Sequence, residues 1–197
     1  MLFRSPNTAK QTAVRTNLAT ASGAWGGTLT DAQRTAWNDF ASNFPITDRL
    51  GQTLQLTGQQ AFVRLNSRLL NAGLSQITTA PTDQAVSDVT SITATVTVTG
   101  SVMTLGFSPS PLAAGDYMIV RATPAFSPGK SYFTNALRDI QISSSAATTP
   151  LDISADWVAA FGAFPAAWTK IGFSVNVIRA SNGAYDAELR ATAVVGA

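Results

Sequence analysis

The chain has 197 residues, of which 45% are hydrophobic and 12% are charged, with a formal net charge of +2 and no His or Cys. The lack of His and Cys excludes Ser-His-Asp triads, His- or thiolate-bound metals, thiol catalysis and disulfides. The low charge predicts an unusually neutral surface, which suits lasting contact with other proteins or is a compositional habit of the source.

The beginning of the chain predicts an extended arm followed by a helix. Residues 1–7 contain the apolar pair Leu2-Phe3 and show no apolar segment of the kind found in signal peptides, so we expect synthesis without Sec export. A helix is expected over about 8–25, where apolar residues fall on one face and Gly26-Gly27 ends the pattern. No apolar run approaches 18 residues, and no membrane partner is expected.

Two further helices have clear start signals. Thr30 and Thr57 each precede a Gln by three residues, which is the spacing of a capping box. Apolar residues then recur at helical spacing and should form the core between the helices; they are Trp37, Phe40, Ala41, Phe44, Phe62, Leu65, Leu69 and Ala72. Pro45 ends one helix and Gly73 the other. The connection between them, 45–56, predicts a short strand or extended clip.

The apolar period changes from 3.6 to 2 after residue 88. The polar, aperiodic segment 75–88 is interpreted as a linker between a helical unit, 1–74, and a β-domain, 89–197. Strands are expected over 89–99, 102–108, 116–123, the second half of 132–143, 168–180 and 184–195. A short helix capped by Ser154 is expected at 154–164. Short strands separated by Pro and Gly turns predict an antiparallel sandwich.

The last hairpin, VNVIRASNGAYDAELRATAVV at 175–195, resembles the F–G hairpin of fibronectin type III domains. The resemblance implies an immunoglobulin-like topology, from which this chain departs by its inserted helix around Trp157 and by lacking a Trp in the second strand. The predicted fold class is therefore α+β: an N-terminal three-helix unit followed by an immunoglobulin/fibronectin III-like β-sandwich with one inserted short helix.

Few residues suggest catalysis. Asp186 and Glu188 are two apart in a predicted strand and share a face, where they would bind Ca²⁺, act as acid and base, or, as we favour, add solubilising charge. The SPGKS sequence at 127–131 lacks the glycine spacing of a phosphate loop and predicts a turn. We therefore expect no enzyme activity, no cofactor and no small-molecule substrate.

DNA binding is a weaker alternative. Residues 1–74 contain seven basic and three acidic residues, and Arg64 and Arg68 lie one turn apart where they could meet phosphates. A helix-turn-helix needs a turn of three or four residues, whereas the connection here is about twelve. These basic faces are more simply explained by contact with solvent or protein.

Three segments resemble a group of uncharacterised proteins encoded in phage and prophage-like gene clusters. They are LTDAQRTAWNDFA at 29–41, LTGQQAFVRLNSRLLNAG at 56–73 and RATPAFSPGKSYFTNALRDI at 121–140. The group has no established activity. The resemblance implies a virion component made in the host cytoplasm: a capsid decoration, a head–tail connector or a tail protein.

Taken together, these features predict a structural protein that contacts copies of itself or a major capsid or tail protein. Exposed aromatic and Arg side chains favour interfaces, and the expected contact residues are Leu2, Phe3, Arg4, Arg15, Arg64, Arg68, Phe126 and Tyr132. The principal alternative is a carbohydrate- or cell-surface-binding module in which Tyr132, Phe133 and Trp168 stack on sugar rings.

Overall fold

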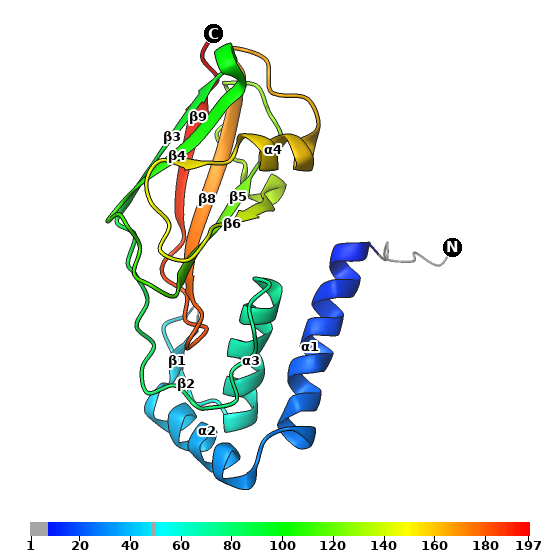
Figure 1. Ribbon diagram of the computed structural model, residues 1–197, viewed down its shortest axis with the longest axis vertical. Helices are drawn as coiled ribbons and strands as arrows, with labels where there is room; N and C mark the ends of the chain where they lie inside the picture. Colours follow the sequence, from blue (N-terminus) through cyan, green and yellow to red (C-terminus); the bar gives the residue numbers. More distant parts are fainter. Residues whose placement is uncertain (1–7, 49) are drawn as a thin grey trace. The chain divides into compact units, whose positions relative to one another are not determined.

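The structure is a computed structural model that describes residues 8–48 and 50–197, and it combines helices with antiparallel sheets (Figure 1). The expected α+β class is confirmed. The chain divides into two compact units. The first contains the chain up to Ala85 together with Ala180–Gly183, and the second contains Val86–Arg179 and Ala184–Ala197.

The first unit has three helices: α1 (Ala9–Gly27), α2 (Asp31–Asn43) and α3 (Gly58–Asn71). Each follows a Thr whose hydroxyl accepts a hydrogen bond from the backbone N–H of a Gln three residues on, while the side-chain oxygen of that Gln accepts the backbone N–H of the Thr. The capping boxes at Thr30 and Thr57 are thus confirmed, and Thr8 forms a third. A hairpin of β1 (Ile46–Thr47) and β2 (Thr53–Leu54) occupies the connection between α2 and α3, as expected.

Aromatic rings form the core of the first unit. The expected core residues Trp37, Phe40, Phe62 and Leu65 are all buried. Trp37 meets Phe62 almost edge to face, with 5.2 Å between ring centroids, and the N-terminal end of α3 lies directly against α2. This contact requires Gly58, because a β-carbon there would lie 2.6 Å from the backbone nitrogen of Asn38.

The first half of the expected linker is fixed to this core. The fully buried Asn66 donates to the carbonyls of Phe62 and Ile77 and accepts from the Ile77 N–H at 2.8 Å. Trp37 donates its indole N–H to the carbonyl of Thr78 at 2.9 Å. The boundary between the units therefore falls after Ala85, within the predicted linker, because buried side chains satisfy the polar backbone that precedes it.

We expect Asn66→Asp to lower the free energy of unfolding by about 2–4 kcal/mol, because a carboxylate oxygen would replace the amide that donates to two carbonyls in a buried site. Chemical denaturation followed by circular dichroism measures the effect. Asn17→Asp is the control, since its bond to Asn71 is exposed, and it should cost less than about 1 kcal/mol. Equal costs for the two variants would show that the Asn66 contacts contribute little.

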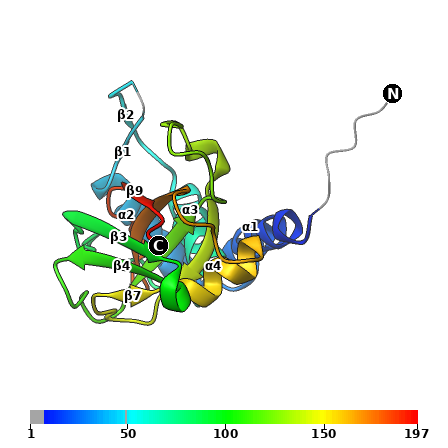
Figure 2. The same ribbon diagram turned by 90° about the horizontal axis from the view of Figure 1, so that it is seen from above.

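The second unit contains two antiparallel sheets. One has the order β3-β4-β7, with β3 (Ser91–Thr97), β4 (Val102–Ser108) and β7 (Leu151–Asp152). The other has the order β6-β5-β8-β9, with β6 (Arg138–Ile142), β5 (Asp116–Ala122), β8 (Lys170–Arg179) and β9 (Leu189–Val194). In Figure 2 the strands β3, β4 and β7 lie side by side. A short helix, α4 (Ser154–Phe161), follows β7.

Both sheets contribute to one apolar core, as in a β-sandwich. Met103 and Leu105 of β4 and Val120 and Phe173 of the other sheet belong to a single buried cluster. Trp157 of α4 belongs to the same buried cluster, and its indole N–H donates to the carbonyl of Thr123 at 3.1 Å. Because alternate residues of β8 enter this core, the remaining residues of β8 face away from it.

Some predicted boundaries were wrong in detail. The last strand begins at Leu189 rather than 184. Ser154 is the first residue of α4 and not its cap; its hydroxyl bonds to Asp152 and to the backbone of Met103 instead. The two-residue β7 carries too little periodicity to be recognised in the sequence, and pairing with β4 defines it.

Candidate functional site

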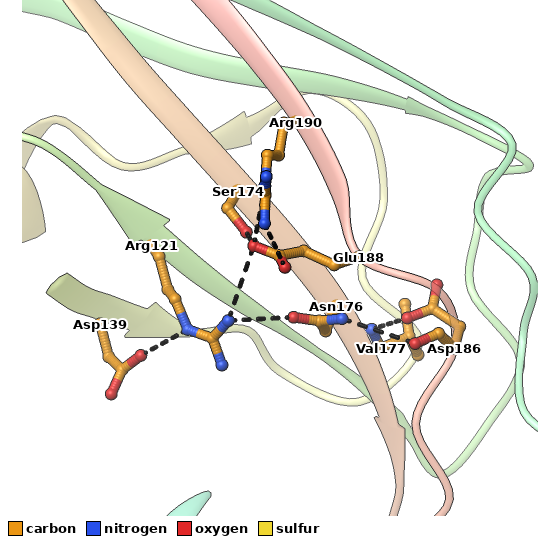
Figure 3. Close-up of polar contacts among 8 residues, drawn as sticks. All are labelled: Arg121, Asp139, Ser174, Asn176, Val177, Asp186, Glu188 and Arg190. Atoms are coloured by element: carbon orange, nitrogen blue, oxygen red, sulfur yellow. Dashed lines mark hydrogen bonds and ion pairs between the residues drawn. The ribbon is translucent and has the colours of Figure 1, made fainter. Parts of the chain in front are cut away.

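Polar side chains gather on the outer face of the four-stranded sheet, the face turned away from the core. Strand register places Asp139, Arg121, Ser174 and Arg190 in one row across β6, β5, β8 and β9. Glu188, just before β9, joins this row (Figure 3). Four segments distant in the sequence thus contribute to one cluster.

The cluster is a continuous set of charge-assisted bonds (Figure 3). Arg121 pairs with Asp139 at 2.8 Å and donates to the side-chain oxygen of Asn176 at 3.2 Å. Glu188 accepts bonds from the hydroxyl of Ser174 and from Arg190, the latter at 2.9 Å, and lies 3.9 Å from Arg121. Each charged group has an opposite partner.

These contacts determine the protonation of Glu188. The hydrogen bond from Arg190 lowers the pKa of Glu188, and the Ser174 bond and the charges of both arginines act in the same direction against partial burial. The carboxylate is therefore ionised at neutral pH and raises the pKa of Arg190 in return. Such a group orients its neighbours, whereas a general acid or base requires a pKa near the working pH.

A pocket of about 370 Å³ lies beside the cluster, between residues 131–134 and residues 190–192 of β9. The Tyr132 side chain is 65% exposed there. Phe133 is buried instead, because its ring lies over Gly172, where a β-carbon would be 2.6 Å from a ring carbon. The prediction that Phe133 is an open stacking platform was wrong, whereas Tyr132 and Trp168 are both exposed.

The structure brings together only some of the predicted contact residues. Leu2, Phe3 and Arg4 lie outside the described residues. Arg15 is exposed on α1, while Arg64 and Arg68 are half-buried on α3, where burial lowers the pKa of Arg64.

Phe126 and Tyr132 lie in one loop of the second unit, between β5 and β6. Phe126 is half-buried and stacks on Phe133 with 6.3 Å between ring centroids, and the Lys130 ammonium lies 5.7 Å from the Phe126 ring centroid. The segment 127–131 is a turn, as predicted, closed by a bond from the Lys130 N–H to the Ser127 carbonyl. These residues adjoin the pocket through Phe133.

The polar row itself was missed by sequence analysis. One indication of it was visible in the sequence. Ser174 and Asn176 alternate with apolar residues in one strand, so their side chains lie on the face of the sheet that is turned away from the apolar core. Their partners Arg121 and Arg190 are found only once strand order and register are known.

Asp186 and Glu188 both precede β9 and both are bonded within the protein, so they do more than add solubilising charge. Asp186 is half-buried, whereas Glu188 is an exposed residue. Asp186 accepts the Val177 N–H at 2.6 Å and, more weakly, the Val89 N–H at 3.5 Å. Burial raises the pKa of Asp186 to about 6, helped by the nearby charges of Asp88 and Asp116 and opposed by the two backbone bonds.

Asp186 should make stability depend on pH. A raised pKa means that the favourable contribution is complete below the usual Asp value of 3.8 and is lost as the pH rises through about 6. Asp186→Asn keeps a carbonyl for the Val177 N–H but does not ionise. We therefore expect the variant to gain about 1–2 kcal/mol over the wild type between pH 4 and pH 7, after allowing for solvent screening. If the free energies of unfolding of wild type and Asp186→Asn differed by the same amount at every pH in this range, the raised pKa of Asp186 would be wrong.

Within the described part of the chain, no cluster of three or more acidic side chains is arranged to hold a metal ion. No helix among the described residues has the length and apolar character needed to cross a membrane. No protein-family model matches the chain, and no curated protein matches it at a significant level.

Proposed function

We propose that this chain is a non-enzymatic structural protein of a phage-like particle that acts through contacts with copies of itself or with a major capsid or tail protein. The observation that carries this proposal is the large exposed surface of α1. Within α1, all of whose residues are described, Ala21 is the one buried residue, while Val14 and Leu18 are 44% and 50% exposed.

A helix with exposed apolar side chains, such as α1, is expected to pack against another protein surface. Most helical stability in proteins comes from packing an apolar face. Val14 and Leu18 lie one turn apart, so they share a face near the start of α1. α1 is attached to α3 at its middle through the Asn17–Asn71 bond, and near its C-terminal end through the contact of Trp25 with Phe62, whose ring centroids are 5.7 Å apart. A second copy that covers Val14 and Leu18 would supply the missing packing.

Strand order supports a fibronectin III-like or immunoglobulin-like topology for the second unit. If β3, β4 and β7 are strands A, B and E, then β5, β8 and β9 are C, F and G, and β6 is an added strand beside C. The hairpin that resembles the F–G hairpin is the β8–β9 pair. Such sandwiches commonly present binding surfaces rather than catalytic groups.

The proposed absence of catalysis is supported by the electrostatics of the polar row. Glu188 is held ionised by its partners, and Arg121 and Arg190 are paired with carboxylates. We infer that these ion pairs stabilise the outer face of the four-stranded sheet and take no part in catalysis. The resemblance of 29–41, 56–73 and 121–140 to phage-encoded proteins supports a place in a virion.

Sedimentation velocity at micromolar concentration tests the role of α1. We expect the wild-type chain to form an oligomer and the double variant Val14→Glu/Leu18→Glu to sediment as a monomer, because two charges would have to be buried in the contact. Thr16→Glu adds one negative charge, half that of the double variant, at an exposed position of the same helix and should leave the oligomer intact. Helical circular dichroism confirms that each variant is folded.

Two results would contradict the proposed contact. One is an oligomer that the double variant leaves unchanged. The other is dissociation by Thr16→Glu to the same extent, which would point to general charge repulsion rather than to an apolar contact.

A further inference from the structure

Beyond assembly, we propose that the pocket between residues 131–134 and β9 binds an acidic saccharide, with Tyr132 stacking on a sugar ring and Arg190 pairing with its carboxylate. The pocket lies wholly within the second unit. Its volume of about 370 Å³ is within the range of small-molecule sites, ~300–1,000 Å³.

Tyr132 and Phe133 have different roles in the pocket. Phe133 is fixed over Gly172 and gives the pocket a rigid apolar wall, while Tyr132 next to it stays 65% exposed. The C–H groups on one face of a sugar ring form an apolar patch, and such a patch packs well on an aromatic face whose hydroxyl remains in water. Ser131, Thr134 and Thr192 also line the pocket, and each carries a hydroxyl that can donate or accept a hydrogen bond.

Arg190 is held in position for an anion. Glu188 receives two of its five N–H donors, on Nε and Nη2, and is itself fixed by Ser174. The Arg190 side chain is nevertheless 49% exposed. A guanidinium that is restrained but open loses little conformational freedom when a carboxylate binds, and charge-assisted bonds to a carboxylate are strong.

The local charge favours an acidic ligand over a neutral one. Lys170 lies two positions from Gly172 on the outer face, and Lys130 lies over Phe126, which stacks on the wall residue Phe133. Arg190 lines the pocket, and Arg121, Lys130 and Lys170 lie on the same sheet face or in the adjoining loop. In the polar row Asp139 pairs with Arg121 and Glu188 pairs with Arg190, so the two lysines add positive charge beyond these pairs. A carboxylate in the pocket would reduce this excess of positive charge.

Calorimetric titration of the full chain tests the site. Tetragalacturonate is the acidic probe, and maltotetraose, which has four neutral sugars, is the matched control. We expect tetragalacturonate to bind with a dissociation constant of about 1 mM or tighter and maltotetraose to bind at least about tenfold more weakly, since it lacks a charged partner for Arg190.

Single substitutions locate the binding. Tyr132→Ala and Arg190→Gln should each weaken tetragalacturonate binding about tenfold, through lost stacking and a lost charge-assisted bond. Arg190→Lys keeps the charge and should retain more affinity than Arg190→Gln. Trp168→Ala is the control for an exposed aromatic outside the pocket lining and should change affinity less than twofold.

Three results would overturn the proposal. They are the absence of tetragalacturonate binding at 10 mM probe (about ten times the expected constant), equal binding of both saccharides, and a loss in Trp168→Ala as large as that in Tyr132→Ala. Tyr132 is largely exposed, so its substitution keeps the test valid even if an Arg190 variant loosens the polar row. None of these results bears on the α1 contact.

Discussion

Gly58→Ala is expected to be strongly destabilising, lowering the free energy of unfolding by about 3 kcal/mol. A β-carbon at position 58 would lie 2.6 Å from the Asn38 nitrogen and 2.8 Å from the Trp37 carbonyl carbon. Both are backbone atoms, so α3 would have to move away from α2, and overpacking of this kind costs about 1–3 kcal/mol or more. The bond from the Gly58 N–H to the Asn38 side chain, 3.1 Å, would be lost as well.

Gly23→Ala supplies the matched control. Gly23 lies inside α1, and a β-carbon there would meet nothing within 4 Å. Alanine is the better helix former, so this variant should gain about 0.5–1 kcal/mol. Urea denaturation followed at 222 nm measures both. If the two variants changed stability in the same direction, the close contact between α2 and α3 would be wrong.

Asp116→Asn is expected to have an effect at least as large, about 3–5 kcal/mol, because it breaks a buried ion pair on one side only. Asp116 is fully buried, and its two oxygens accept bonds from Arg179 at 2.6 and 2.9 Å. It also accepts the Ser87 N–H at 2.8 Å. The neutral amide would leave the Arg179 charge without its counter-ion.

Asp31→Asn tests whether burial is the reason. Asp31 pairs with Arg34 at a similar distance, 2.6 Å, but its side chain is 97% exposed. Exposed pairs contribute about 0–1 kcal/mol, so this variant should be nearly neutral. Comparable losses in the two variants would show that the Asp116–Arg179 pair does not have the buried geometry described.

The pH dependence provides a second check on Asp116. Burial alone would raise the pKa of Asp116, but the bonds from Arg179 and Ser87 outweigh it and hold the pKa below the usual 3.8. A lowered pKa means that the contribution is present above that value and is lost as the pH falls through the folded-state pKa. In strong acid, wild type should therefore lose its stability advantage over Asp116→Asn, whereas acidification from pH 7 to pH 4 should raise the stability of wild type relative to Asp186→Asn.

The helices could be predicted because their signals are local. Capping boxes at Thr30 and Thr57 and the stop at Pro45 act within a few residues, and the structure has the same helices. The strands β4 and β5 were likewise visible in the alternation of apolar residues. In each case the neighbouring sequence determines the backbone conformation.

The candidate site could not be predicted in the same way. Arg121, Ser174 and Arg190 are distant in the sequence, and only strand register places them in one row. Asp186 looked like an exposed charge until its bond to the Val177 N–H was seen. The polar segment after Gly73 looked free because nothing local shows that Asn66 and Trp37 bind its backbone.

The measurement that tests the central claim most directly is the mass of the purified wild-type chain in solution, by light scattering over a range of micromolar concentrations. A single chain has a mass of 20.6 kDa. If the exposed face of α1 is a contact between copies, the measured mass will be a defined multiple of this value. A mass equal to one chain at every concentration would contradict assembly through α1.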